Sequence, residues 1–169
     1  RYIAQLAPGA VFVDAGAFVG EYAVRAARRT GASGRVIAIE PSPDTYAVLS
    51  ANAAVNRCDN IQTVNCALGK TEGDITFYCT SDDLSVSSIK PDHIAHQYGQ
   101  DARNLQSFTV PMRRLDHVLD ELKVEHVDLL KIDAEGADED ILRGSVGLLT
   151  ARRIGTVIAE IHDNPKGIM

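Results

Sequence analysis

Two acidic residues stand at the ends of apolar segments in the first part of the chain. Asp14 ends the segment 11–14, and Glu40 ends the segment 35–40. Gly16 and Gly20 follow Asp14, and this spacing predicts a tight turn that opens a helix with free backbone N–H groups. Glu40 lies near the interval at which a nucleotide-binding fold places its ribose-binding acid. The pair therefore predicts a cleft that holds a nucleoside through its ribose.

The charge of Asp14 limits what that nucleoside carries. A carboxylate beside the glycine turn would repel a pyrophosphate, and the G-x-x-x-G spacing is not the G-x-G-x-x-G of dinucleotide enzymes. We therefore expect a ligand without phosphates, preferably one that carries positive charge. A nicotinamide-dependent oxidoreductase remains an alternative.

A third group of candidate residues follows the apolar segment 127–133. Asp133, Glu135 and Gly136 emerge where a substrate could lie. Glu160 and His162 alternate onto one face after the apolar run 157–159 of the segment 154–161. Asp133, Glu160 and His162 are our candidate catalytic residues, since together they can act as a general base or bind a divalent cation. Alternatively, they satisfy one another structurally. For His93 and His96 we prefer solvated loop histidines to a metal site, which would need further ligands.

The elements that must position these residues alternate between strands and helices. Strands are predicted at 11–14, 35–40, 61–67, 127–133 and 154–161, with amphipathic segments between most of them. Ser42 and Pro43 are typical of a helix start. This order predicts an α/β fold with a doubly wound, mainly parallel sheet. The interval 70–111 differs: short strands at 75–79 and 107–110 flank the polar stretch 81–106, which we expect to be a β-rich insertion with a lid.

Composition is that of one globular domain over residues 1–169. Hydrophobic residues make up 45% of the chain, and the formal charge of −6 argues against nucleic acid as the main partner. We expect no membrane partner, because no apolar run is long enough for a span. Three scattered cysteines favour reduced thiols and a cytoplasmic location, with Cys66 as a small core residue.

With these features in place, the chain resembles a known family. Its segments FVDAGAFVGEY, VIAIEPSPDTYAVLSANAAVN, SVSSI, RRLDHVL, VDLLKIDAEGADEDILRG and VIAEIH are similar, in this order, to the FkbM-type family of S-adenosylmethionine-dependent methyltransferases. The resemblance covers nearly the whole chain, and KIDAEGAD is its most specific part. It implies a class I methyltransferase (Rossmann-like) fold and O-methyl transfer from S-adenosylmethionine to a hydroxyl of a small molecule, such as a sugar or natural product.

The resemblance also implies roles for individual residues. The turn residues Asp14, Gly16, Ala17, Phe18 and Gly20 would surround the methionine part of the cofactor, and Glu40 with Pro41 would hold the ribose. Other positions that it implies for cofactor binding are, along the adenine, Asn65, Cys66, Ala67 and Leu68; in the insertion, Ser87 and Ser88; and near the methyl group or amino-acid end, Asp133, Glu135 and Gly136.

Three departures from the family pattern affect these expectations. Phe18 stands where the family often has Asn, which is the one hint of a non-catalytic nucleoside-binding module. At the position where many class I methyltransferases have an acid that contacts the adenine, this chain has Asn65 or Cys66. The chain also stops at Met169, before the last two strands expected of this fold. We expect either a continuation or a partner to cover the edge strand 154–161; the sequence does not set the oligomeric state.

Overall fold

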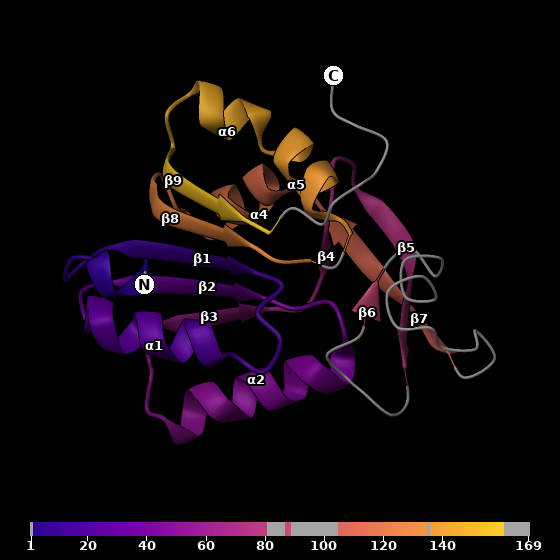
Figure 1. Cartoon of the computed structure of the whole chain (residues 1–169), viewed down its shortest axis with the longest axis horizontal. Coiled ribbons are helices and arrows are strands. Elements are labelled where there is room, and N and C mark those ends of the chain that lie inside the picture. Colours follow the sequence, from indigo (N-terminus) through magenta and orange to yellow (C-terminus); the bar gives the residue numbers. More distant parts are fainter. Residues whose placement is uncertain (1, 81–86, 89–104, 135, 161–169) are drawn as a thin grey trace.

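The predicted strands form one parallel sheet whose order reverses at its middle. The computed structural model describes residues 2–80, 87–88, 105–134 and 136–160. Five strands pair in parallel in the order β3-β2-β1-β8-β9, a doubly wound arrangement (Figure 1). Because the chain leaves β1 first for β2 and later for β8, a crevice is expected at the carboxyl ends of these strands. The strand bounds are β1 Val11–Ala15, β2 Arg35–Ile39, β3 Ile61–Val64, β8 Val127–Ile132 and β9 Ile154–Ala159.

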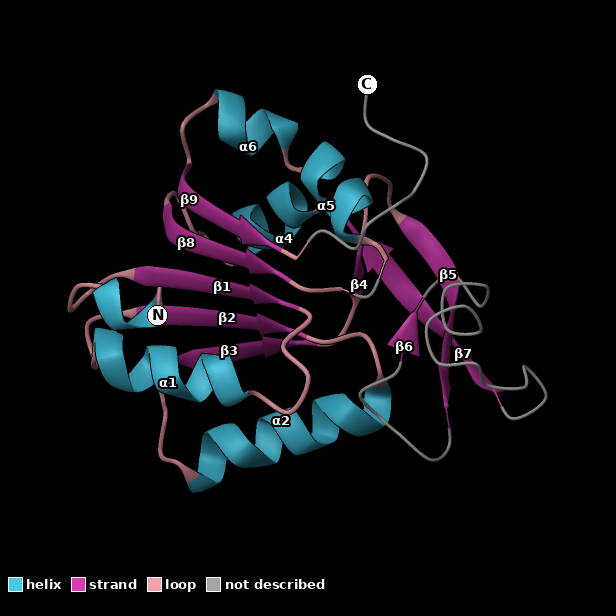
Figure 2. Ribbon diagram, in the orientation of Figure 1, coloured by secondary structure: helices cyan, strands magenta, loops and turns pink. Residues whose placement is uncertain are grey.

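Helices cover both faces of this sheet (Figure 2). Helices α1 (Glu21–Thr30) and α2 (Pro43–Val55) lie on one face, together with the short 3-10 helix η1 (Ile3–Gln5). Helices α4 (Leu115–Glu121), α5 (Asp138–Gly144) and α6 (Val146–Thr150) lie on the other. The predicted cap is confirmed: Ser42 accepts a hydrogen bond from the Thr45 N–H, and Pro43 is the first residue of α2.

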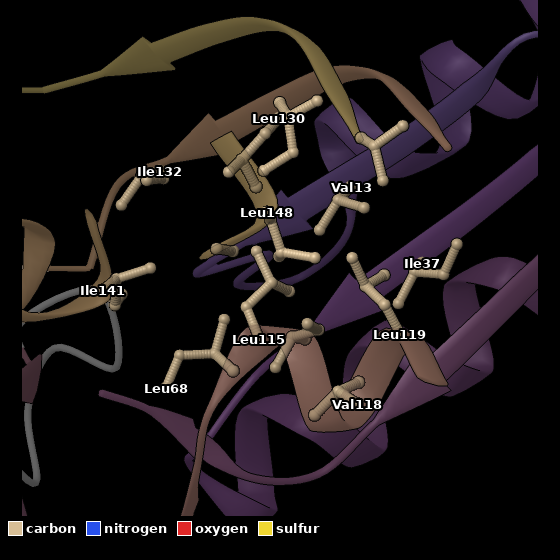
Figure 3. Packing of buried hydrophobic residues seen from close by; sticks show 14 of the residues in the cluster. Val13, Ile37, Leu68, Leu115, Val118, Leu119, Leu130, Ile132, Ile141 and Leu148 are labelled. Atoms are coloured by element: carbon tan, nitrogen blue, oxygen red, sulfur yellow. The ribbon is translucent and has the colours of Figure 1, made fainter. Parts of the chain in front are cut away.

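Strand alternation divides the buried residues between the two faces. On the α4–α6 face, Val13, Ile37 and Leu130 pack against Leu119 and Leu148 (Figure 3). On the opposite face, the intervening strand residues pack against the small apolar side chains of α1. This period of two fixes which strand residues can reach the site.

A second sheet lies beyond the carboxyl ends of the first (Figure 1). Its strands are β4 (Ala67–Leu68), β5 (Gly73–Thr80), β6 (Ser87–Ser88) and β7 (Leu105–Arg113), in the order β4-β7-β5-β6. The β-rich insertion is thereby confirmed. The predicted lid at 81–106 falls mostly on residues outside the described part of the chain.

The predicted strand 61–67 is wrong in its second half. The first sheet keeps only Ile61–Val64, and Ala67 pairs instead with Met112 of the second sheet. The Asn65 amide donates to the carbonyl oxygens of Glu40 (2.8 Å) and Pro41 (3.0 Å), which ties the chain to the end of β2 at this point. The sequence pattern does not show such a change of sheet, because the segments on both sides of it are strands.

Among the described residues, β9 is an edge of the first sheet. The residues after Glu160 lie outside the described part of the chain. What covers this edge therefore stays a prediction.

Candidate active site

The candidate acids come together because of strand alternation. Phe12, Ala38 and Leu129 pack on the face covered by α1, so residues two positions further along each strand lie on that face too. This rule places Asp14, Glu40 and Lys131 on one face. They lie at or just after the carboxyl ends of β1, β2 and β8. By the same rule Asp133, and Glu160 two residues after Ile158, share that face.

Glu40 follows β2 and has a buried carboxylate that organises the loops around it. Its Oε2 accepts from the Phe18 N–H at 2.9 Å, and its Oε1 accepts from the Ser42 N–H at 3.0 Å. The residue is 4% exposed, and burial raises the pKa of its carboxyl to about 7, although the two N–H groups oppose that shift. Each oxygen has a second acceptor position, so the group can still accept two hydroxyls.

The glycine turn between β1 and α1 is built to fit closely against β8. Gly16 has φ +76°, and a Cβ at this residue would collide with the carbonyl oxygen of Asp133. Gly20 has φ +87°, and a Cβ there would lie 2.6 Å from a methyl carbon of Leu49. Both positions therefore require glycine.

The N–H groups of this turn are already used inside the protein. Those of Gly16 and Ala17 both donate to the carbonyl oxygen of Ile39 at 3.0 Å, and that of Gly20 donates to Ala17 at 2.8 Å. The N–H of Phe18 donates to Glu40. These four amides are thus not available to a phosphate group, unlike those of a phosphate-binding helix start.

Phe18 occupies a strained position in the turn. Its φ is 50°, a left-handed conformation in which Asn is common and bulky side chains are rare. The Asn that the resemblance implies at this position would suit this backbone better than Phe does. Phe18 as a whole residue is 38% exposed.

Asp14 is fully buried and paired with a cation. Lys131 Nζ lies 3.2 Å from Asp14 Oδ1 and 3.2 Å from Asp133 Oδ2. Burial raises the pKa of Asp14 to about 6, against the opposing effect of the Lys131 ammonium. Burial by itself would lower the pKa of Lys131, but the two carboxylates outweigh it and raise that pKa. Direct contact of Asp14 with a cofactor stays a prediction.

Two of the three candidate catalytic residues share a cavity. Asp133 and Glu160 line a cavity of about 540 Å³ on the α1 face, together with Tyr22 and Lys131. Backbone hydrogen bonds fix both acids, since Asp133 N–H donates to Ala15 and Glu160 N–H donates to Ile132, each at 3.0 Å. Sequence reasoning placed these two residues on one rim, as the structure does. His162 lies outside the described residues.

The positions predicted along the adenine are mostly part of the protein interior. Cys66, Ala67 and Leu68 are 1%, 3% and 5% exposed. Burial raises the pKa of the Cys66 thiol to about 12, so this cysteine has the inert environment of a core residue. Contact of these side chains with adenine stays a prediction.

The remaining candidate residues are only partly described. Ser87 and Ser88 form strand β6, which pairs with β5 through Cys79 and Tyr78. Glu135 lies outside the described residues, while Gly136 has φ +91° and its N–H donates to Asp138 Oδ2 at 3.2 Å. The cofactor roles of these residues stay predictions.

Sequence reasoning gave no role to Lys131 or to the side-chain amide of Asn65. A signal for Lys131 did exist, since a Lys in phase with Asp133 on a buried strand needs a carboxylate partner. For Asn65 there was none, because its partners are backbone carbonyls of another loop.

Within the described residues, no helix is long and apolar enough to cross a membrane. Nor does that part of the chain bring three His, Cys, Asp or Glu residues together in a way that could hold a metal ion. His93 and His96 are not among the residues described.

Comparison with known structures identifies the class of fold. The crystal structure of an FkbM methyltransferase from Methylobacillus flagellatus matches with a TM-score of 0.59 and 17% identity, covering 89% of this chain and 32% of that one. A precorrin-6y C5,15-methyltransferase from Geobacter metallireducens matches with a TM-score of 0.53 and 14% identity, covering 94% and 56%. The sheet order and these matches define a class I methyltransferase fold.

Sequence comparison identifies the family. The profile of the Methyltransferase FkbM domain matches residues 14–168, so the chain belongs to the FkbM methyltransferase family. A protein named Methyltransferase 1 from Beauveria bassiana is 27% identical over 155 residues, and Methyltransferase sdnD from Sordaria araneosa is 28% identical over 163 residues. Each match covers 84% of this chain, which spans only 61% and 62% of the two relatives.

Proposed function

We propose that this chain transfers a methyl group from S-adenosylmethionine to a hydroxyl of a small-molecule acceptor. The observation that carries the proposal is the buried Glu40 carboxylate, which retains two acceptor positions at the carboxyl end of β2. Membership of the FkbM methyltransferase family supports the same reaction class.

The residues present fit a nucleoside that has no phosphates. A carboxylate that accepts from both ribose hydroxyls gains two charge-assisted hydrogen bonds, worth about 1.5–3 kcal/mol each. A pyrophosphate would need turn amides that already donate to Ile39, Ala17 and Glu40. This disfavours a nicotinamide-dependent oxidoreductase.

The chemistry divides between the donor and the protein. Bound S-adenosylmethionine supplies an activated methyl group. The protein aligns the acceptor, excludes water and receives the proton that the hydroxyl loses as it attacks. Asp133 and Glu160 support this last role because both line one cavity on the α1 face of the sheet. His162 remains a third candidate for the base.

Calorimetry with two ligands tests the proposal. We expect S-adenosylhomocysteine to bind the wild-type protein and NADH not to bind. Glu40→Ala should weaken S-adenosylhomocysteine binding about 100-fold or more, since two charge-assisted hydrogen bonds are lost.

The control is Glu139→Ala, which removes an exposed acid of α5 that pairs with Arg143 on the surface. It should bind like the wild type. Binding of NADH, or unchanged affinity in Glu40→Ala, would refute the proposed site. Release of S-adenosylhomocysteine in the presence of a hydroxylated acceptor would separate the enzyme from a non-catalytic nucleoside-binding module.

A further inference from the structure

One ammonium group connects two parts of the site that are distant in the sequence. Lys131 Nζ lies 3.2 Å from carboxylate oxygens of both Asp14 and Asp133, and it donates to the carbonyl oxygen of Gly16 at 3.3 Å. It also lies 5.1 Å from the centre of the Tyr22 ring. The Lys131 side chain is only 14% exposed, so these contacts replace most of its hydration.

The buried acid beneath this cation does not reach the cavity itself. Asp14 is 0% exposed, whereas Lys131 and Asp133 both line the cavity of about 540 Å³. A ligand in the cavity therefore contacts Lys131 rather than Asp14. The Asp14 carboxylate affects such a ligand only through its ion pair with Lys131. This differs from the expectation that Asp14 contacts the cofactor directly.

We propose that Lys131 is a positioning residue of the site. Its ammonium group, with Asp14 as buried counter-ion, holds the glycine turn and the Asp133 carboxylate in fixed places relative to each other. The inference rests on the proposed function only in assigning the turn and Asp133 to the methyl-transfer site. Removal of one partner from a buried pair leaves an uncompensated charge, which gives the role a measurable signature.

The first test compares thermal unfolding of Lys131→Met, of the double variant Asp14→Asn with Lys131→Met, and of Lys70→Met at pH 8. Methionine keeps most of the apolar stem, so the single variant mainly removes charge. Lys131→Met should lower Tm strongly, and the double variant should regain part of that loss because the buried Asp14 charge is removed together with its partner. The matched control Lys70 also lies 3.2 Å from a carboxylate, that of Asp140, but is 56% exposed; Lys70→Met should change Tm little.

The second test follows the Asp14 carboxyl carbon by ¹³C NMR as the pH changes. The titration midpoint of Asp14 should lie near pH 6 in the wild type, since its pKa is about 6, and should move to higher pH in Lys131→Met. The midpoint in Lys70→Met should match that of the wild type. A side chain that serves packing alone would not move this midpoint. The charged or titratable groups that share the ion network or line its cavity are Lys131, Asp133, Glu40, Tyr2, Tyr22, Arg25, Arg29 and Glu160.

The third test uses S-adenosylhomocysteine as a probe in calorimetry. The double variant should bind it about tenfold more weakly than the wild type, because the turn loses the cation that holds the Gly16 carbonyl. An unmoved Asp14 midpoint in Lys131→Met, a double variant no more stable than the single, or unchanged affinity would each overturn the proposal. Failure of the wild type to bind the probe would instead refute the proposed function, and the first two tests would still decide the role of Lys131.

Discussion

At the scale of single residues, the ionisation of Glu40 should control ligand binding. Burial places its pKa at about 7, so the carboxyl is protonated well below that pH and ionised well above it. Only the ionised form can accept hydrogen bonds from both ribose hydroxyls while it keeps those from Phe18 and Ser42. We therefore expect the affinity for S-adenosylhomocysteine to rise by roughly tenfold between pH 6 and pH 8.

Calorimetry at pH 6, 7 and 8 measures this dependence. The same series on Glu139→Ala should follow the wild-type curve, since that acid is exposed and pairs with Arg143 on the surface. An affinity that is flat, or that falls as the pH rises, would show that the ionised Glu40 carboxylate does not hold the ligand.

Phe18 shows what a residue type alone does not reveal. From the sequence it was a departure from the family pattern and a hint of a non-catalytic nucleoside-binding module. The structure adds that its backbone is left-handed and that its N–H is one of the two donors to Glu40. Neither the left-handed backbone nor the hydrogen bond to Glu40 can be predicted from the identity of the Phe18 side chain.

At the scale of elements, the site depends on how closely the turn after β1 approaches the end of β8. Gly16→Ala should destabilise the protein strongly, because the new Cβ would collide with the Asp133 carbonyl and the backbone has φ +76°. We expect a loss of roughly 3 kcal/mol or more in the free energy of unfolding, together with loss of ligand binding.

Gly147→Ala is the matched control within helix α6. Nothing lies within 4 Å of the Cβ that it would add, so it should stabilise the protein by about 0.5–1 kcal/mol. Urea unfolding measures both variants. A Gly16→Ala protein as stable as the wild type would mean that the turn after β1 does not approach the Asp133 carbonyl as described.

Several elements could be read from the sequence because their signals are local. Apolar runs located the strands of the first sheet, and Ser42 with Pro43 marked the start of α2. The break after Val64 could not be predicted in this way, since it depends on contacts that Asn65 makes with the loop after β2. Tertiary hydrogen bonds decided the element boundary.

At the scale of the whole molecule, the sheet order explains why distant acids meet. Strands β2 and β8 are far apart in the sequence, yet both lie beside β1, so Glu40 and Asp133 end on opposite sides of one glycine turn. The sequence predicted this meeting from the order of strands and helices. It did not predict the role of Lys131, because the charge balance of Asp14 appears only once β1 and β8 are paired.

A crystal structure with bound S-adenosylhomocysteine tests the central claim most directly. We expect both ribose hydroxyls within hydrogen-bond distance of the Glu40 carboxylate, and the sulfur directed toward the cavity lined by Asp133 and Glu160. A ribose held elsewhere, or a sulfur that points away from those two acids, would contradict the account.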